Sequence, residues 1–402
     1  MERAIVLGAG YGAIGVMRAL ALEGLKVTLL YADPHDHACH SRFASEKIQI
    51  SNPMDDDTSL LEVLMQAKNW DGALLIPTLD EYIIFISKNC AELNKKYCFT
   101  LPGWEQTRQI ILKDLLYMHA RQINVPTPRF FLPDNLEDFR ECKDDFCYPL
   151  ILKPCQTHKF DRLYGRKNLI AHDFQELTEH FADTQRRGLK MLLSEIIPGD
   201  DSAIFTYRSY LDCQGNILGE MCTQKLRQYP TCFGQGAVVR SIPMLPEVRS
   251  QALMLLHCLG YHGESSTEFK LDYRDQQYKL MEINVRPVVT EWLFVKAGLN
   301  FPYMTYLDEI KNIRQAPPAY KPELYWIHLY WDAINFVELL KAGKLKLKEF
   351  LQPYTKEKVF VLPLFDDPMH FLLETYFNLK RALTKLIRNR FKPVRRPKIR
   401  QG

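Results

Sequence analysis

Apolar runs alternate with amphipathic stretches over the first part of the chain. AIVLGAG at residues 4–10, KVTLLYAD at 26–33 and GALLIPT at 72–78 have the continuous apolar character of buried strands. Between them, residues 11–24 and 59–70 carry apolar side chains at helical spacing. Strands separated by helices of this length are typical of a parallel, doubly wound sheet, so we expect a small α/β domain here.

Proline and glycine mark two boundaries farther along the chain. Pro102 and Gly103 precede a helix that we expect over residues 105–123. The proline-rich stretch 314–323 precedes a last section with a helical pattern, interrupted by KVFVLPLFDDP. Three parts are therefore predicted: an α/β domain at residues 1–105, a mixed α/β and α+β region at residues 106–310, and a helical section at residues 311–402.

Polar residues occupy every second position of one late strand, KLMEINVRP. Glu282, Asn284 and Arg286 share a face, spaced about 6.6 Å apart, because consecutive strand residues point to opposite sides. Carboxylate and amide oxygens side by side are suited to Mg²⁺, and an arginine beyond them is suited to phosphate. The opposite face takes the remaining residues, Lys279, Met281, Ile283 and Val285.

A second carboxylate is expected beside this face. Glu268 lies in STEFKLD, a candidate strand that the turn-forming YRDQQ joins to the first. A hairpin would bring Glu268 beside Glu282, and neighbouring carboxylates repel each other unless a cation bridges them. The pattern therefore predicts a magnesium site, and a solvated strand face with an incidental salt bridge is the alternative.

Other charged residues stand at the ends of candidate strands. Lys153 ends YPLILKP and Lys167 begins the next strand, where lysines over a nucleotide cleft would neutralise phosphate charge; singly, each is more often a surface lysine. LLSEIIPGDD runs from a strand into a glycine turn. Its Glu195 and Asp201 are available for an adenine edge and for ribose hydroxyls.

GAGYGAIG at residues 8–15 places four glycines between the first strand and the first helix. Glycine there permits a tight turn and close approach of a phosphate to the helix N-terminus. Taken alone, this loop indicates an NAD enzyme, but the same loop serves domains that hold no dinucleotide. A Rossmann-type NAD-dependent oxidoreductase is therefore kept as an alternative. That function would not use the strand face of Glu282, Asn284 and Arg286.

The composition, 47% hydrophobic and 25% charged over 402 residues, is that of an ordinary globular protein. The chain opens on an apolar strand without a signal segment, and no stretch reaches the ~18 apolar residues of a membrane span. We therefore expect a cytoplasmic protein. Ten cysteines without CxxC spacing favour reduced thiols, and HDHACHS is too tightly spaced for a closed zinc site.

Basic residues are concentrated at the C-terminal end of the chain. Ten of the 52 basic residues lie between Lys380 and Arg400, and no acidic residue follows Glu374. A basic amphipathic helix can lie on an anionic membrane surface, cover the protein's own core or meet an acidic partner. Peripheral contact at the inner face of the membrane is one expectation, and binding of nucleic acid is not expected. The apolar positions at helical spacing are Leu372, Tyr376, Leu379, Leu383 and Leu386.

The motifs LILKP, LLSEIIPGDD, STEFKLD and KLMEINVRP, in this order, resemble the ATP-grasp superfamily, whose members bind Mg-ATP between two lobes. LIPTLDEY, KLRQYPTCFGQG and FDDPMHFL are similar to the carbamoyl-phosphate-synthase-like carboxylate–amine ligases, a branch that includes D-aspartate ligases. The resemblance covers most of residues 1–375. It implies an N-terminal Rossmann-like pre-ATP-grasp domain, a two-lobed ATP-grasp fold with its lid lobe at about 125–195, and a helical C-terminal section.

The resemblance also implies a nucleotide site. Lys153 and Lys167 would contact ATP phosphates, with Lys159 as a replacement for Lys167, because THKFDRLYGRK lacks the glycine-rich form of many relatives. The hinge against adenine would be formed by Glu195, Ile196 and Ile197. Asp201 would take the ribose.

The remaining implied roles concern metal and chemistry. Arg286 would meet the transferring phosphoryl group, and LKD at residues 112–114 departs from the usual Asp-Lys pair, which leaves Lys113 without an assigned role. Asp80 and Glu81 are candidates for recognising the amine or for capping the next helix. The ligands of Mg²⁺, or of Mn²⁺ in its place, would be Glu268, Glu282 and Asn284. The substrate carboxylate or acyl phosphate would be bound by Lys225, Arg227 and Arg240.

The chemistry implied by the resemblance is activation of a carboxylate by ATP to an acyl phosphate, followed by attack of an amine. Such phosphoryl transfer needs positioning and charge stabilisation rather than a protein nucleophile. We expect small-molecule carboxylate and amine substrates, an amino acid or a cell-envelope precursor among them, and a homodimer. A non-catalytic ATP-binding regulatory protein is a further alternative. The presence of Glu268, Glu282, Asn284 and Arg286 together argues against it.

Overall fold

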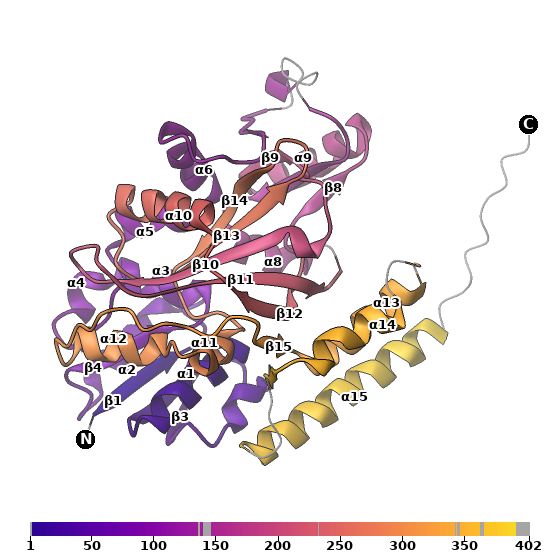
Figure 1. The fold of residues 1–402 in the computed structure, drawn as a ribbon. Coiled ribbons are helices and arrows are strands. Elements are labelled where there is room, and N and C mark those ends of the chain that lie inside the picture. Colours follow the sequence, from indigo (N-terminus) through magenta and orange to yellow (C-terminus); the bar gives the residue numbers. More distant parts are fainter. Residues whose placement is uncertain are drawn as a thin grey trace, which may run out of the picture.

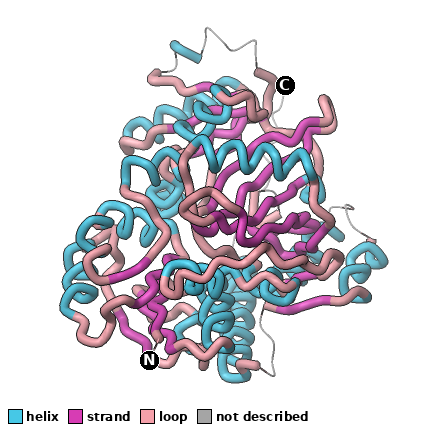
Figure 2. The backbone as a smooth tube through the Cα atoms, turned by 60° about the vertical axis from the view of Figure 1, so that its left-hand side comes forward, coloured by secondary structure: helices cyan, strands magenta, loops and turns pink. Residues whose placement is uncertain are grey.

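The computed structural model describes residues 2–135, 137–139, 146–231, 233–341, 343, 346–361 and 366–390, without the side chains of residues 37, 157, 158 and 381–390. In Figure 1 the amino-terminal sheet lies lowest, a large sheet lies in the middle, and a small sheet lies at the top. Figure 2 shows the strands in the interior with helices around them. No helix in the described part of the chain is long and apolar enough to cross a membrane.

The amino-terminal part forms a parallel sheet. Its elements are β1 Arg3–Leu7, α1 Tyr11–Leu22, β2 Lys26–Tyr31, β3 Glu46–Gln49, α2 Asp57–Gln66, β4 Ala73–Pro77, α3 Asp80–Lys88, α4 Cys90–Leu93 and β5 Tyr97–Cys98. The strand order is β3-β2-β1-β4-β5. The three apolar runs form β1, β2 and β4 as predicted. The outer strands β3 and β5 lack such runs, because β3 alternates half-buried and exposed residues and β5 is two residues long.

The large sheet has seven strands. They are β10 Ile204–Leu211, β11 Ile217–Tyr229, β12 Gln235–Ile242, β13 Gly263–Asp272, β14 Gln277–Asn284, β15 Tyr325–Ile327 and β16 Lys358–Phe360. Their order is β14-β13-β10-β11-β12-β15-β16, antiparallel except for the β15–β16 pair. The section predicted to be helical therefore also contributes two strands, which extend the sheet beyond β12.

The small sheet is antiparallel, in the order β6-β9-β7-β8. Its elements are β6 Phe130–Phe131, β7 Leu150–Pro154, α8 Thr157–Tyr164, β8 Leu169–Ala171, α9 Phe174–Arg186 and β9 Met191–Glu195. Most of the glycine-poor stretch THKFDRLYGRK forms α8, and the helix is closed by Gly165, whose φ of 60° lies in the left-handed region.

The remaining helices lie between and beside the sheets. They are α5 Trp104–Ile111, α6 Lys113–Gln122, α10 Pro246–Cys258, α11 Glu291–Ala297, α12 Phe301–Glu309, α13 Leu329–Lys341, α14 Leu347–Leu351 and α15 Pro368–Arg390. The single helix predicted over residues 105–123 is two helices, because the backbone at Leu112 is extended, with φ −87° and ψ 120°. This break makes Lys113 the first residue of α6.

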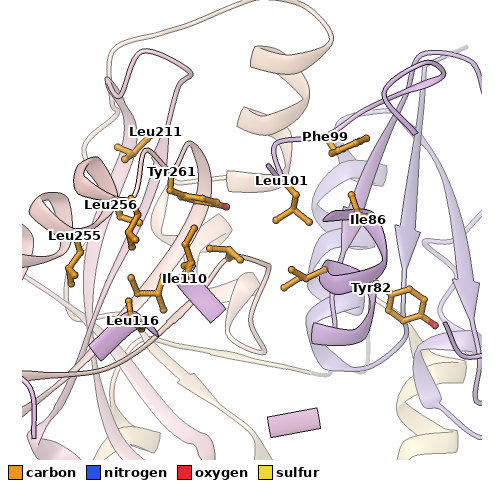
Figure 3. Packing of buried hydrophobic residues seen from close by; sticks show 14 of the residues in the cluster. Tyr82, Ile86, Phe99, Leu101, Ile110, Leu116, Leu211, Leu255, Leu256 and Tyr261 are labelled. Atoms are coloured by element: carbon orange, nitrogen blue, oxygen red, sulfur yellow. The ribbon is translucent and has the colours of Figure 1, made fainter. Parts of the chain in front are cut away.

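One hydrophobic cluster joins the amino-terminal sheet to the large sheet (Figure 3). Tyr82 of α3 and Leu101 contribute from one side, and Leu211 of β10 and Leu256 of α10 from the other. All four are at most 5% exposed. The predicted mixed α/β class is confirmed, and the division of the chain at residues 105 and 310 stays a prediction.

The glycine loop packs α1 against α11. A Cβ atom at Gly15 would lie 2.7 Å from Glu291 Cβ, and one at Gly12 would lie 3.5 Å from the Pro287 carbonyl oxygen. Gly15 is therefore required by the close approach of Glu291, whereas the distance at Gly12 is an ordinary van der Waals contact. This packing accounts for Gly15 without a dinucleotide.

Candidate functional site

A cleft lies over the strands of the large sheet. Alternate residues of neighbouring strands line it, so their side chains share one face of the sheet. The lining residues are Lys167, Thr206, Thr223, Lys225, Gly234, Gln235, Gly236, Val239, Ser266, Glu268, Glu282, Asn284, Arg286, Val288, Val289, Thr290 and Phe294. Five predicted site residues of the β11, β13 and β14 region are thus brought together, and Lys167 joins them from the small sheet.

Two carboxylates face each other across the β13–β14 hairpin. Glu268 pairs in register with Glu282, and Ser266 pairs with Asn284, as the predicted hairpin requires. Side chains directly opposite in this way lie about 5 Å apart at Cβ. The Asn284 amide donates a hydrogen bond to Glu282 Oε1 at 3.2 Å. The hairpin therefore concentrates oxygen atoms and negative charge at one point of the cleft.

The strict alternation predicted for β14 is wrong near Met281. The register shifts between Glu268 and Phe269, so that Phe269 pairs with Leu280 and Met281 is the extra residue of a bulge. Leu280, rather than Lys279 or Met281, therefore joins Ile283 and Val285 in the core. Lys279 instead donates to Asp272 Oδ2 at 2.6 Å.

Each carboxylate of the hairpin is paired with a lysine. Lys113 Nζ lies 2.9 Å from Glu282 Oε2, and Lys225 Nζ lies 3.0 Å from Glu268 Oε2. Burial opposes the charge on Lys113, but the Glu282 carboxylate outweighs it and raises the pKa of Lys113. The attraction of Lys113 in turn holds the pKa of Glu282 well below its usual range. Both groups of this pair therefore stay charged at neutral pH.

Lys113 is a site residue that the sequence pattern did not assign. Its stretch ILKDLL was noted only for departing from a familiar pair, and the helix break that aims it at Glu282 has no signal in the apolar spacing. The same helix supplies Tyr117, whose hydroxyl accepts a hydrogen bond from Lys153 Nζ at 3.1 Å. Burial, aided by the positive charge of Lys113, lowers the pKa of Lys153 to about 7.

Arg286 is held by the amino-terminal part of the chain. Its Nε donates to Asp80 Oδ1 at 2.6 Å, at the first residue of α3. Desolvation opposes both charges, but their attraction lowers the pKa of Asp80 and raises that of Arg286. Asp80 thus orients the cleft arginine.

Two of the predicted substrate-binding arginines are bound elsewhere. Arg227 donates to both carboxylate oxygens of Asp332 on α13, at 2.6 and 2.8 Å. Arg240 donates twice to Gln224 Oε1, at 2.9 and 2.8 Å. Of the three basic residues predicted for this role, Lys225 is the one that lines the described cleft.

The predicted adenine and ribose residues lie at the end of β9 and just after it. Glu195 Oε1 accepts a hydrogen bond from the backbone N–H of Arg129 at 2.8 Å, and Arg274 donates to its other oxygen at 2.8 Å. The next two residues, Ile196 and Ile197, are half-buried and buried.

Asp201, predicted to take the ribose, accepts hydrogen bonds from the Gln228 backbone and side chain, at 3.0 and 2.7 Å. Lys159, the predicted replacement for Lys167, is exposed on α8, while Lys167 lines the cleft.

The donor set suits a magnesium ion. The described residues hold no cluster of three or more His, Cys, Asp or Glu side chains that could bind a metal. The two hairpin carboxylates and the Asn284 amide offer hard oxygen ligands, which Mg²⁺ prefers, and magnesium sites usually complete their coordination with water or substrate oxygens. Glu268, Glu282 and Asn284 therefore fit this ion better than a tetrahedral zinc site.

Comparison with known proteins supports the predicted resemblance, although no family model matches the chain. A D-aspartate ligase of Enterococcus faecium (strain Aus0004) is 24% identical over 324 residues, 77% of this chain and 76% of that protein. The carbamoyl phosphate synthase large chain of Methanothermobacter thermautotrophicus (strain ATCC 29096 / DSM 1053 / JCM 10044 / NBRC 100330 / Delta H) is 22% identical over 243 residues, 56% of this chain and 22% of that protein.

The fold of the chain is similar to that of a solved biotin carboxylase domain. The biotin carboxylase domain of the Hydrogenobacter thermophilus 2-oxoglutarate carboxylase, solved as a dimer with MgADP and bicarbonate, has a TM-score of 0.63 to this chain at 19% identity. The match covers 80% of this chain and 73% of that one. The predicted resemblance to the ATP-grasp carboxylate–amine ligases is confirmed in sequence and in fold.

Proposed function

We propose that this protein is an ATP-dependent ligase that activates a carboxylate as an acyl phosphate and joins it to an amine. The observation that carries the proposal is the opposed pair Glu268 and Glu282 with Asn284 beside it, surrounded by the cations Lys113, Lys225 and Arg286. Paired carboxylates for a metal and cations for phosphate are the two requirements of phosphoryl transfer.

The residues of the cleft have separate roles in binding the metal ion and the phosphate groups. Glu268, Glu282 and Asn284 would hold Mg²⁺ (or Mn²⁺), which supplies charge neutralisation between phosphate groups when bound. Lys113, Lys153 and Lys167 neutralise the phosphate chain of ATP from the α6 and small-sheet side. Arg286, oriented by Asp80, stabilises the charge on the transferring phosphoryl group.

The acceptor side of the cleft is formed by Lys225 and the Gly234–Gly236 turn. Lys225 attracts the substrate carboxylate and releases Glu268 for the metal as it does so. Arg227 and Arg240 support this strand pair from outside the cleft, through Asp332 and Gln224. An amino acid is the favoured substrate class, because the D-aspartate ligase matches along three quarters of both chains.

Several features of the proposal concern the whole protein. The Rossmann-like domain at residues 1–105, the two-lobed ATP-grasp domain at 106–310 and the C-terminal section at 311–402 are supported by the three sheets. The hinge role of residues 195–197, the ribose role of Asp201, a homodimer and a cytoplasmic location stay predictions.

The first test measures thermal stabilisation by Mg-ATP, by ATP without Mg²⁺ and by NAD. We expect Mg-ATP to raise the melting temperature most, since a ligand that binds the folded state stabilises it. Stabilisation by NAD, with no effect of Mg-ATP, would favour the oxidoreductase alternative.

The second test measures release of ADP and phosphate over a panel of amino acids. Turnover that depends on a carboxylate and an amine supports the ligase, whereas ATP binding without turnover supports the regulatory alternative. Glu282→Gln is expected to lower kcat by at least about 100-fold, because it removes a metal ligand and leaves Lys113 unpaired. Glu62→Gln, an exposed position on α2, is the matched control and should leave turnover unchanged.

A further inference from the structure

The exposed side of α15 is apolar. Met369, Leu372, Tyr376 and Leu379 are 57 to 61% exposed and recur at helical spacing, so they form one stripe. We call these four residues the α15 stripe. A helix on the surface of a globular protein normally presents polar residues to water, and this one presents the opposite.

The polar side of the same helix faces the protein. Glu374 is fully buried and accepts a hydrogen bond from Tyr11 at 2.5 Å. Thr375 bonds to Tyr330 of α13, and His370 is 1% exposed. The helix is thus fixed with its polar residues inward. The stripe therefore does not cover the protein's own core.

Neighbouring helices add to this surface. Sixteen large hydrophobic side chains are exposed among the described residues, and nine of them lie on α13, α14 and α15. In Figure 1 these three helices extend to one side of the sheets. Beyond the stripe, the nine include Ile334, Val337, Leu340, Leu347 and Leu351. Such a concentration marks an interaction surface rather than scattered surface residues.

The charge of the chain that follows identifies the occupant. From Lys380 to Arg400 the sequence has ten basic residues and no acidic one. Two copies of this chain joined through the stripe with their helices parallel would bring the two basic segments together, and these would repel each other. An apolar stripe continued by Lys and Arg is the pattern of helices that lie in the interface of anionic membranes.

We propose that the α15 stripe docks on the surface of an anionic phospholipid bilayer, to which the positive charge of the sequence from Lys380 to Arg400 adds electrostatic attraction. The helix lies flat, since its inner side is bound to Tyr11 and Tyr330. Docking does not involve the cleft over β13 and β14, so it is independent of the ligase proposal.

The test is co-sedimentation of the full chain with vesicles of phosphatidylcholine alone and with phosphatidylglycerol added. We expect binding to the anionic vesicles that weakens with salt, and much weaker binding to the neutral ones. Leu372→Ser with Leu379→Ser should weaken binding to anionic vesicles by about tenfold or more, because two apolar side chains that docking would bury are lost. Arg395→Gln with Arg396→Gln should weaken it less and reduce the effect of salt.

Met254→Ser on α10, an equally apolar position that is 46% exposed, is the matched control and should bind as the unchanged chain does. An unchanged melting temperature, measured without vesicles or nucleotide, shows that each variant is folded. Equal binding by the Leu372/Leu379 variant would overturn the proposal. An absence of vesicle binding by the unchanged chain would also overturn it. If the unchanged chain instead self-associates or binds an acidic protein, and the Leu372/Leu379 variant does not, the occupant of the stripe is a protein.

Discussion

The ammonium group of Lys153 titrates in an unusual range. Burial and the neighbouring Lys113 lower its pKa to about 7, although Glu282 and Glu268 act in the other direction. Its ordinary value is 10.5, so between these values the unfolded chain binds a proton that the folded chain does not. This residue therefore makes the folded state more stable as pH rises through that window. Phosphate binding has the opposite preference, because it needs the charged form.

We predict that the affinity for Mg-ATP falls as pH rises above about 7, by up to about tenfold per pH unit for a single titrating group. Bound phosphate favours protonated Lys153, so binding at this pH takes up a proton. The measurement is isothermal titration calorimetry at several pH values, in buffers of different ionisation enthalpy. Lys153→Met should bind more weakly, without this proton uptake. The same uptake in the variant would show that another group is responsible.

Single residues differ in how much their sequence context reveals. Glu282 and Asn284 were predictable, because a period of two places both on one face whatever the rest of the chain does. Arg227 was not, because its partner Asp332 lies 105 residues away and charge alone cannot distinguish a substrate ligand from a buried ion pair. A basic run in sequence shows the charge but not its partner.

At the scale of elements, a buried ion-pair cluster joins β10, β13 and α11. Arg208 is fully buried, and its guanidinium lies 2.8 Å from Glu291 Oε2 and is also paired with Glu264. It donates to the Arg286 carbonyl oxygen as well, at 3.2 Å. Arg208 therefore fixes the segment that carries the cleft arginine to the sheet and to the start of α11.

Arg208→Met is predicted to destabilise the protein by about 3–5 kcal/mol, because it leaves two buried carboxylates without a cation. The double variant Arg208→Met with Glu291→Gln should recover part of this loss, since one of the unpaired charges is then removed. Urea unfolding of both variants measures the difference. A double variant less stable than Arg208→Met would mean that packing, rather than charge, dominates here.

The elements also set a limit on prediction. The apolar runs predicted β1, β2 and β4, but the apolar spacing continues across Leu112, where the helix breaks. The bulge at Met281 likewise leaves no trace in a strand pattern. Both irregularities arise from tertiary packing, and both aim a charged residue: Lys113 toward Glu282, and Lys279 toward Asp272.

At the scale of the whole molecule, His328 lies where the first and last parts of the chain meet. It is fully buried, stacks on Trp331 with ring centroids 4.0 Å apart, and meets the edge of Tyr11. Burial lowers the pKa of His328 from 6.5 to about 3. Below about pH 6.5 the unfolded chain therefore binds a proton that the folded chain excludes.

It follows that the folded state loses stability as pH falls from 6.5 toward 3, by up to about 1.4 kcal/mol per pH unit from this residue. His328→Phe keeps an aromatic ring and removes the proton, so its stability should depend less on pH in this range. Urea unfolding near pH 7 and near pH 5 compares the two proteins. Equal loss in both would assign acid sensitivity to other groups.

The strands β15 and β16 close the large sheet late in the chain. During synthesis on the ribosome, the outer edge of β12 has no partner until residue 327 has emerged. The outer edge of β15 has no partner until residue 360 has emerged. An unpaired strand edge invites pairing with other chains. Chains released before β15 has emerged would expose the edge of β12. We therefore expect chaperones and proteases to bind the nascent chain at β12.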